Sequence, residues 1–204
     1  QEEFEVQTVD REARFVERGQ QIIPEFLAEA VERRTFRPEQ VEAIQSRITG
    51  VDGTENVAAD TDLVIEAVFE DFDIKTQVFA TLDEVCGEET ILASNTSSLS
   101  VNELAAATGR PDRFVGLHFF YHPAKNRLVE LIPAVSSSPE TVCRVEQFCK
   151  QLGKVVIVCS DRPRCVVNRF FLPWLREACL LLQPGVSSAR AIHAAARASF
   201  HIRT

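Results

Sequence analysis

The chain has 204 residues, a length that suits one domain or one domain with part of a second. With 45% hydrophobic and 25% charged residues, it is expected to be globular with a sizeable core. The net charge of -8 argues against general nucleic-acid binding, which needs basic patches to neutralise phosphates. No apolar run approaches the roughly 20 residues of a membrane span, so we expect no membrane partner.

The six cysteines form no CxxC pair, and no set of histidines has a metal-ligand spacing. We therefore expect no metal site, and reduced thiols in the cytoplasm, or in the mitochondrial matrix if the source is eukaryotic. The sequence opens with Gln1, Glu2 and Glu3, which do not resemble a signal peptide. Because the chain has no Met and begins within a predicted strand, we expect a piece of a longer polypeptide.

The first quarter of the chain predicts a strand followed by two charged helices. Residues 4–10 alternate in polarity and form a short strand that ends at Asp10. Apolar residues then recur at helical spacing over 11–34, where Pro24 marks a possible break. A second helix is expected from Pro38, with its apolar stripe continuing through Ile48 to a stop at Gly50.

Strands and helices then alternate. The segment Asp62–Val68 is nearly continuously apolar, a pattern typical of a parallel strand covered on both faces. Ser100 and Glu103 form a capping box for one helix, and Ser138 begins another that ends at Gly153. The remaining strands are expected at residues 90–94, 114–120, 128–132 and 155–159, and a further helix is expected over 74–85.

This alternation predicts an α/β fold with a Rossmann-like, doubly wound parallel sheet. The character changes after residue 166, where helices are expected over 170–182 and 188–200 with Pro184 between them. We therefore predict an N-terminally incomplete dinucleotide-binding domain at 1–166. Residues 167–204 are expected to begin an all-α second domain.

Two polar residues interrupt predicted apolar strands. His118 lies in the segment 114–120, and imidazole is suited to take a proton near neutral pH. Glu130 lies in the segment 128–132, where a buried carboxylate is costly unless it is paired. A His118–Glu130 pair would satisfy both groups. The alternatives are a core histidine held by backbone groups and a glutamate that faces outward from an edge strand.

Three further positions have the chemistry of ligand contacts. Asp10 ends a strand, where an acidic side chain can accept hydrogen bonds from ribose hydroxyls. Ser97 follows another strand, and Asn168 lies near the junction with the helical region. Each could equally be a turn or helix-cap residue.

The order and spacing of six segments resemble the 3-hydroxyacyl-CoA dehydrogenase family over nearly the whole chain. The segments that carry this resemblance are Asp62-Leu-Val-Ile-Glu-Ala-Val68, Ala93-Ser-Asn-Thr-Ser-Ser-Leu99, Gly116-Leu-His-Phe-Phe120, Leu128-Val-Glu-Leu-Ile132, Leu152-Gly-Lys154 and Val166-Val-Asn-Arg169. The resemblance implies NAD-dependent, reversible oxidation of an (S)-3-hydroxyacyl-CoA thioester to the 3-ketoacyl-CoA. It also implies a role in fatty-acid β-oxidation or related metabolism.

The resemblance further implies roles for individual residues. His118 would be the general base, and Glu130 would orient it and stabilise its charged form. Ser97 and Asn168 would bind the substrate, and the charged helices over 11–48 would lie near its CoA moiety. Asp10, Glu70 and Lys75 would contact NAD, and the helical domain would form a homodimer.

The sequence departs from the family pattern in three places. It has no first strand and no G-x-G-x-x-G loop, which would bring backbone amides to the pyrophosphate. Tyr121 replaces an asparagine, and Arg164 replaces a glycine. A non-catalytic homologue with a binding or structural role is therefore the alternative. A related hydroxyacid dehydrogenase ranks below both, since its catalytic group would be a lysine.

Overall fold

A computed structural model of the chain describes residues 4–162, 165–183 and 185–200. The chain divides into two compact units, Gln1–Asp161 and Arg162–Thr204. The functional domains predicted at 1–166 and 167–204 remain a prediction. Pro184 and the unusual Arg164 lie outside the described residues.

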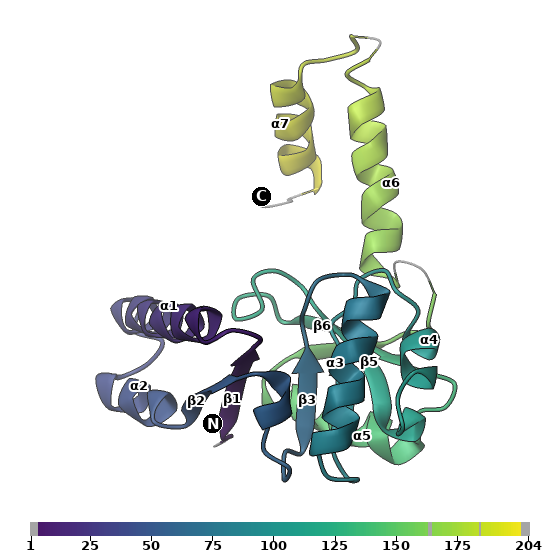
Figure 1. Cartoon of the computed structure of the whole chain (residues 1–204). Coiled ribbons are helices and arrows are strands. Elements are labelled where there is room, and N and C mark those ends of the chain that lie inside the picture. Colours follow the sequence, from purple (N-terminus) through teal and green to yellow (C-terminus); the bar gives the residue numbers. More distant parts are fainter. Residues whose placement is uncertain (1–3, 163–164, 184, 201–204) are drawn as a thin grey trace. The chain divides into compact units, whose positions relative to one another are not determined.

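The first unit contains a two-stranded and a five-stranded sheet (Figure 1). The smaller sheet pairs β1 (Val6–Asp10) with β2 (Ile48–Asp52) in parallel. The larger sheet has its strands in chain order: β3 (Leu63–Glu66), β4 (Ile91–Ser94), β5 (Phe114–Phe119), β6 (Leu128–Pro133) and β7 (Val155–Val158). Strands β3, β4 and β5 are parallel, and the α/β fold class is as predicted.

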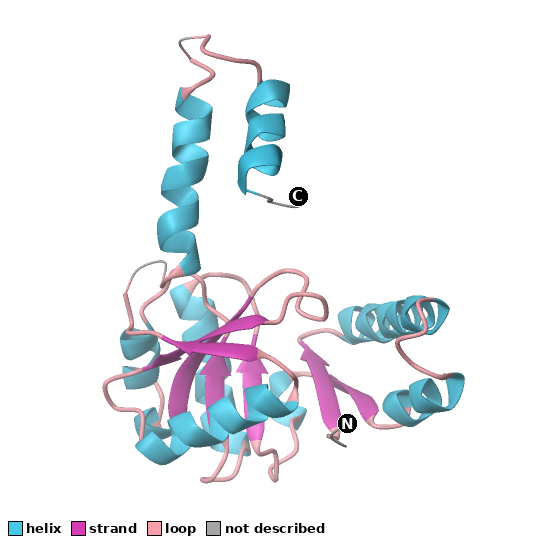
Figure 2. Ribbon diagram, turned by 180° about the vertical axis from the view of Figure 1, so that it is seen from behind, coloured by secondary structure: helices cyan, strands magenta, loops and turns pink. Residues whose placement is uncertain are grey.

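Helices lie on both faces of the larger sheet, the layering of a doubly wound fold (Figure 2). The first two helices of the chain, α1 and α2, connect β1 to β2. The helices of this unit are α1 (Ala13–Glu32), α2 (Pro38–Gln45), α3 (Phe72–Val85), α4 (Val101–Ala106) and α5 (Pro139–Gln151), with short 3-10 turns η1 (Thr54–Asn56) and η2 (Pro111–Arg113).

The two helix starts that were predicted from capping residues are confirmed. The Ser100 side chain accepts a hydrogen bond from the Glu103 N–H, and the Ser138 side chain accepts one from Thr141. Both bonds satisfy amides that the first helical turn leaves without an intrahelical partner. Capping patterns therefore located α4 and α5 correctly from local sequence.

Three expectations need correction. The second helix was expected to reach Gly50, but α2 ends at Gln45, and Ile48 begins β2 instead. The helix α1 continues through Pro24 without a break. The sheet is not parallel throughout, because β6 is antiparallel to β5, and β7 is parallel to β6.

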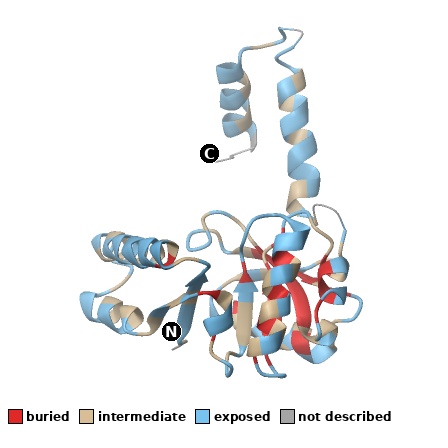
Figure 3. Cartoon of the chain, viewed as in Figure 1, coloured by how far each residue is buried: buried red, intermediate tan, exposed pale blue. Residues whose placement is uncertain are grey.

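The core lies around the central strands of the larger sheet (Figure 3). Every residue of β4 is buried, whereas β3 and β1 are largely half-buried or exposed. The central cluster joins β4, β5 and β6 to α5, and its buried members are Ile91, Ala93, Val115, Leu117, Val129, Leu131, Val145 and Cys149. Burial raises the pKa of the Cys149 thiol to about 11, so this cysteine is a core residue rather than a nucleophile.

The close packing around Gly116 gives a testable prediction. A Cβ atom at this position would lie 2.6 Å from Val101 Cγ2 and 3.1 Å from Ile132 Cβ. We expect Gly116→Ala to lower the free energy of unfolding by about 1–3 kcal/mol, as overpacking does. Gly19→Ala in helix α1 is the matched control. A Cβ atom built at Gly19 would meet no neighbouring heavy atom within 4 Å, and alanine favours the helical conformation. Urea unfolding of both variants would test this, and equal stability would contradict it.

The second unit contains α6 (Val167–Leu180) and α7 (Ala189–Phe200). Several large apolar side chains of α6 are exposed, among them Phe170, Phe171, Leu172 and Leu175. Across the described part of the chain, no helix combines the length and apolar character needed to cross a membrane.

Candidate active site

A buried histidine–glutamate pair lies between two neighbouring strands of the larger sheet. His118 on β5 lies directly opposite Glu130 on β6 in the antiparallel register. His118 Nδ1 is 2.8 Å from Glu130 Oε2, and the two residues are 7% and 0% exposed. The predicted pairing is therefore confirmed. With Nδ1 directed at the carboxylate, Nε2 is the ring nitrogen left for proton exchange.

The pair is at the end of the sheet where α/β folds bind ligands. Strands β3, β4 and β5 are parallel, and Glu66, Ser94 and His118 lie at or near their carboxyl ends. Asn95 connects these ends: its N–H donates to the Glu66 carbonyl at 2.8 Å, and its Oδ1 accepts from the Phe119 N–H at 2.8 Å. The residue after His118 is thereby fixed to the loop that follows β4.

A buried ion pair lies beside this loop. Lys75 Nζ is 2.7 Å from Glu66 Oε1, and the two side chains are 1% and 0% exposed. Glu66 also accepts hydrogen bonds from the Ser94 hydroxyl at 2.6 Å and the Val68 N–H at 2.6 Å. Lys75 donates additionally to the Val68 carbonyl at 3.3 Å. This hydrogen-bond network joins β3, β4 and α3 at the carboxyl ends of β3 and β4.

Glu70 holds the loop that contains Ser97. Its Oε1 accepts from the Thr96 hydroxyl at 2.6 Å, the Ser97 and Ser98 N–H groups at 2.8 Å each, and the Ser98 hydroxyl at 2.9 Å. Partial burial by itself would raise the Glu70 pKa. The hydrogen bonds from Thr96, Ser98 and Ser97 outweigh burial and lower the pKa from 4.5 to about 2.

This lowered pKa predicts how the loop responds to acid. Ionised Glu70 stabilises the folded state fully above about pH 4.5, and the contribution is lost as pH falls toward about 2. We expect Glu70→Gln to be less stable than wild type at neutral pH, and the difference to shrink across that window. Urea unfolding at several pH values would measure it. Glu89→Gln is the control, because its side chain is 78% exposed. A difference independent of pH would contradict the anchoring role.

The other predicted ligand residues occupy separate places. Asp10 is exposed at the carboxyl end of β1, where its Oδ1 accepts from the Arg11 N–H at 2.8 Å. Ser97 is exposed in the loop after β4. Asn168 belongs to the second unit, where it is half-buried in the first turn of α6. Tyr121 is 92% exposed after β5.

The sequence patterns gave no site role to Glu66. Ser94 and Asn95 were considered only as members of the polar segment 94–98, which follows a strand and whose small donors could hold a substrate oxygen. Glu66 carried a usable signal, because it is a carboxylate in a nearly continuous apolar strand, as Glu130 is. The particular hydrogen bonds of Asn95 could not be predicted from that segment, since they depend on the spatial neighbourhood of β3 and β5. Among the residues that the structure describes, no group of three or more His, Cys, Asp or Glu is placed to hold a metal.

The fold and site together define a Rossmann-like α/β domain with a buried imidazole–carboxylate pair at its ligand-binding end. Residues 1–162 match the family described as 3-hydroxyacyl-CoA dehydrogenase, NAD binding domain. The chain therefore belongs to the 3-hydroxyacyl-CoA dehydrogenase family.

Individual relatives agree with this family membership. The chain is 36% identical over 189 residues to the probable 3-hydroxybutyryl-CoA dehydrogenase of Bacillus subtilis, covering 93% of this chain and 66% of the relative. It is 37% identical over 198 residues to the 3-hydroxybutyryl-CoA dehydrogenase of Bradyrhizobium diazoefficiens, covering 97% and 67%. It is 41% identical over 157 residues to the mitochondrial hydroxyacyl-coenzyme A dehydrogenase of Rattus norvegicus, covering 77% and 50%.

Solved structures agree with this family membership. The structure of M. tuberculosis FadB2 superimposes with a TM-score of 0.93 at 32% identity, covering 97% of this chain and 70% of that one. The (S)-3-hydroxybutyryl-CoA dehydrogenase PaaH1 of Ralstonia eutropha superimposes with a TM-score of 0.92 at 35% identity, covering 98% and 70%. The chain spans from about half to two thirds of the length of the curated relatives described above.

Proposed function

We propose that this chain forms the catalytic and NAD-binding part of a 3-hydroxyacyl-CoA dehydrogenase. The reaction is the reversible oxidation of an (S)-3-hydroxyacyl-CoA to the 3-ketoacyl-CoA. The observation that carries the proposal is the buried His118–Glu130 pair, 2.8 Å apart at the carboxyl end of the sheet. A carboxylate that is fully buried beside an imidazole stabilises the imidazolium that forms during proton transfer.

In the oxidation direction, His118 Nε2 takes the proton of the substrate hydroxyl as the C3–H bond breaks. In the reverse direction, the same nitrogen returns a proton to the carbonyl oxygen. Glu130 holds Nδ1 and therefore fixes the ring orientation throughout. Ser97 and Asn168 are the proposed substrate contacts, with hydrogen bonds to the reacting oxygen or to the thioester. The charged helices α1 and α2 are the proposed neighbours of the CoA moiety.

The described residues fit NAD at its ribose end. Asp10 presents an exposed carboxylate at the carboxyl end of β1, the chemistry that ribose hydroxyls require. When bound, NAD would supply the hydride acceptor. Glu70 is partly exposed and is a proposed direct contact, whereas Lys75 is 1% exposed and would act by holding Glu66 and Val68. Because the chain has no G-x-G-x-x-G loop, we expect it to bind NAD weakly by itself.

The first experiment is calorimetric titration of NAD⁺ into two polypeptides. One is the chain as given. The other carries an N-terminal extension that supplies a first strand and a G-x-G-x-x-G loop. Binding by the extended form, followed by NADH oxidation with acetoacetyl-CoA, is the expected result. If the extended form folds but neither binds NAD nor reduces acetoacetyl-CoA, the non-catalytic alternative replaces this proposal.

The second unit is a proposed homodimer surface. Helices α6 and α7 are amphipathic, and α6 exposes the apolar side chains described above. Covering such a face with a second copy would remove it from water. Sedimentation of the chain over a range of concentrations would test this. We propose neither a nucleic-acid nor a membrane partner. The proposed compartment is the cytoplasm, or the mitochondrial matrix in a eukaryote.

A further inference from the structure

The hairpin loop between β5 and β6 joins the two strands that carry His118 and Glu130. It covers residues 120–127. A turn of about two to five residues usually fixes the register of a hairpin, and this loop is longer. A slip of one position would set His118 opposite Val129 or Leu131 instead of the glutamate. The pairing therefore depends on what holds the loop in place.

Lys154 binds this loop from the position directly before β7. Its Nζ donates to the carbonyl oxygens of Pro123 and Asn126, the second at 2.8 Å. The same nitrogen lies 5.7 Å from the centroid of the Phe119 ring, within the range of a cation–π interaction. One ammonium group thus contacts both the loop and the residue that follows His118.

The turn that carries Lys154 is itself fixed. The Gly153 N–H donates to the Lys150 carbonyl at 2.9 Å. The Lys154 N–H donates to the Cys149 carbonyl at 2.9 Å, so α5 ends in a Schellman motif. Gly153 has a φ of +70°, a left-handed conformation that favours glycine. The segment 152–154, part of the family resemblance, therefore holds a lysine at a defined position beside the loop.

The ammonium of Lys154 serves the loop rather than an ion pair. None of the salt bridges among the described residues includes Lys154. Burial lowers the pKa of this half-buried ammonium, which shows that it has lost part of its hydration. The two loop carbonyls supply the hydrogen-bond acceptors that water would otherwise provide.

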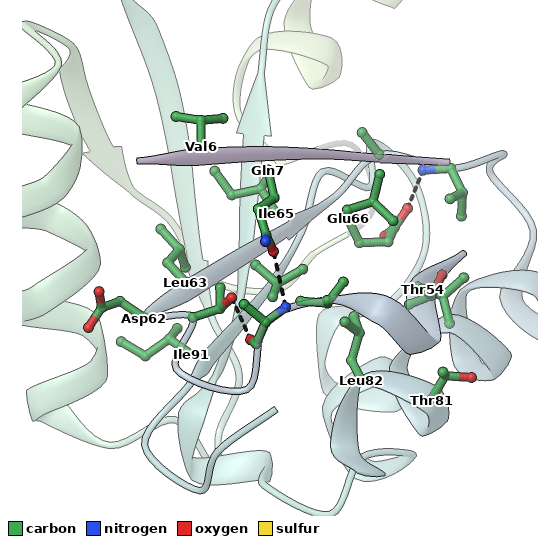
Figure 4. A pocket seen from close by; sticks show the side chains of 18 of the residues that line it. Val6, Gln7, Thr54, Asp62, Leu63, Ile65, Glu66, Thr81, Leu82 and Ile91 are labelled. Carbon is green, nitrogen blue, oxygen red and sulfur yellow. Dashed lines mark hydrogen bonds between the residues drawn. The ribbon is translucent and has the colours of Figure 1, made fainter. Parts of the chain in front are cut away.

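Lys154 does not line the cavity between the two sheets of the first unit (Figure 4). The lining includes Asp10, the proposed ribose contact of NAD, and Phe148 of α5. A substitution at Lys154 should therefore change the hairpin loop and leave the proposed NAD contact at Asp10 intact. This separation allows a kinetic test.

We propose that Lys154 is a positioning residue for the His118–Glu130 pair. Its ammonium holds the hairpin loop at two carbonyl oxygens and so keeps β5 and β6 in the register that sets the imidazole opposite the carboxylate. When the ammonium is removed, water takes its place at the loop, the chain still folds, and His118 loses its single orientation. The kinetic consequence rests on the proposed function, whereas the geometric consequence does not.

The first test observes the imidazole directly, by NMR of chains with ¹⁵N-labelled histidine at about pH 8, above the ordinary imidazole pKa of ~6.5. The His118 signal is identified by its loss in His118→Asn. The partner of one ring nitrogen decides which nitrogen carries the proton, so we expect a single wild-type tautomer, protonated at Nδ1. Lys154→Met should show a mixture of both tautomers. Lys150→Met is the matched control, because that lysine is 62% exposed, and it should give the wild-type signal.

The second test measures turnover of acetoacetyl-CoA with NADH in the N-terminally extended form. Lys154→Met should lower kcat about 10–100-fold and change the KM for NADH by less than about twofold, since a small displacement of a reacting group is enough to slow the reaction. Lys154→Arg should recover most of the loss, because a guanidinium also donates to carbonyl oxygens. Circular dichroism melting would show whether each variant is folded, and Lys154→Gln replaces Lys154→Met if that variant is not.

Several results would overturn the proposal. A folded Lys154→Met chain with the wild-type tautomer signal is one. The others are an unchanged kcat, a loss confined to KM, and an equal loss in Lys150→Met. If the extended wild type has no turnover, the proposed function fails, and the tautomer comparison alone decides the role of Lys154.

Discussion

His118→Asn should reduce the turnover of acetoacetyl-CoA by about 10²–10⁴-fold, the range expected when a general acid or base is removed. Asparagine is the informative substitution because its amide N–H group can still donate to Glu130. The carboxylate, which is 0% exposed, therefore keeps a partner, and loss of turnover is separated from loss of folding. Steady-state kinetics with NADH in the N-terminally extended form would provide the measurement.

The effect should fall on kcat rather than on NAD affinity, since His118 lies near the carboxyl end of β5, whereas Asp10 ends β1 in the other sheet. His193→Asn is the matched control, because His193 is exposed on α7 in the second unit. It should retain wild-type turnover. Unchanged turnover in His118→Asn, with a wild-type melting curve, would remove His118 from the mechanism and leave the pair a structural role.

The strands of the larger sheet were predictable because their signal is local. Segments such as Leu63–Glu66 and Ile91–Ser94 are short apolar runs bounded by polar residues. The strand β2 was not predictable in this way. The apolar stripe of α2 continues in phase to Ile48, and only pairing with β1, more than 40 positions earlier in the chain, makes Ile48–Asp52 a strand. Tertiary pairing there overrides the helical pattern.

The candidate site likewise has features that local sequence predicts and features that only tertiary pairing sets. A histidine and a glutamate in apolar strands could be recognised as a potential pair from sequence alone. Their contact, however, depends on the antiparallel register that sets His118 opposite Glu130, and the sequence pattern favoured a parallel sheet. The Glu70 anchor likewise joins residues 26 to 28 positions apart. Local patterns therefore identified the chemistry, and the sheet topology supplied the geometry.

The Lys75–Glu66 pair should have the largest effect on stability. Both side chains are almost fully buried, and the pair joins α3 to β3. We expect Lys75→Met to lower the free energy of unfolding by about 3–5 kcal/mol, because it leaves a buried carboxylate without its counter-charge. That is a large share of the ~5–15 kcal/mol that stabilises a typical domain. Urea unfolding followed by circular dichroism would measure it.

The control is Lys150→Met, which breaks the exposed Lys150–Glu146 pair on α5, where the lysine side chain is 62% exposed. We expect that change to cost less than about 1 kcal/mol, because water already screens the pair. The double variant Lys75→Met with Glu66→Gln completes the test. Removing the negative charge should recover part of the stability lost in Lys75→Met, since the penalty comes from the unpaired charge. The contrary result is a double variant that loses as much unfolding free energy as Lys75→Met and Glu66→Gln lose together when each is made singly. That result would show that packing of the lysine stem, rather than charge pairing, holds α3 against the sheet.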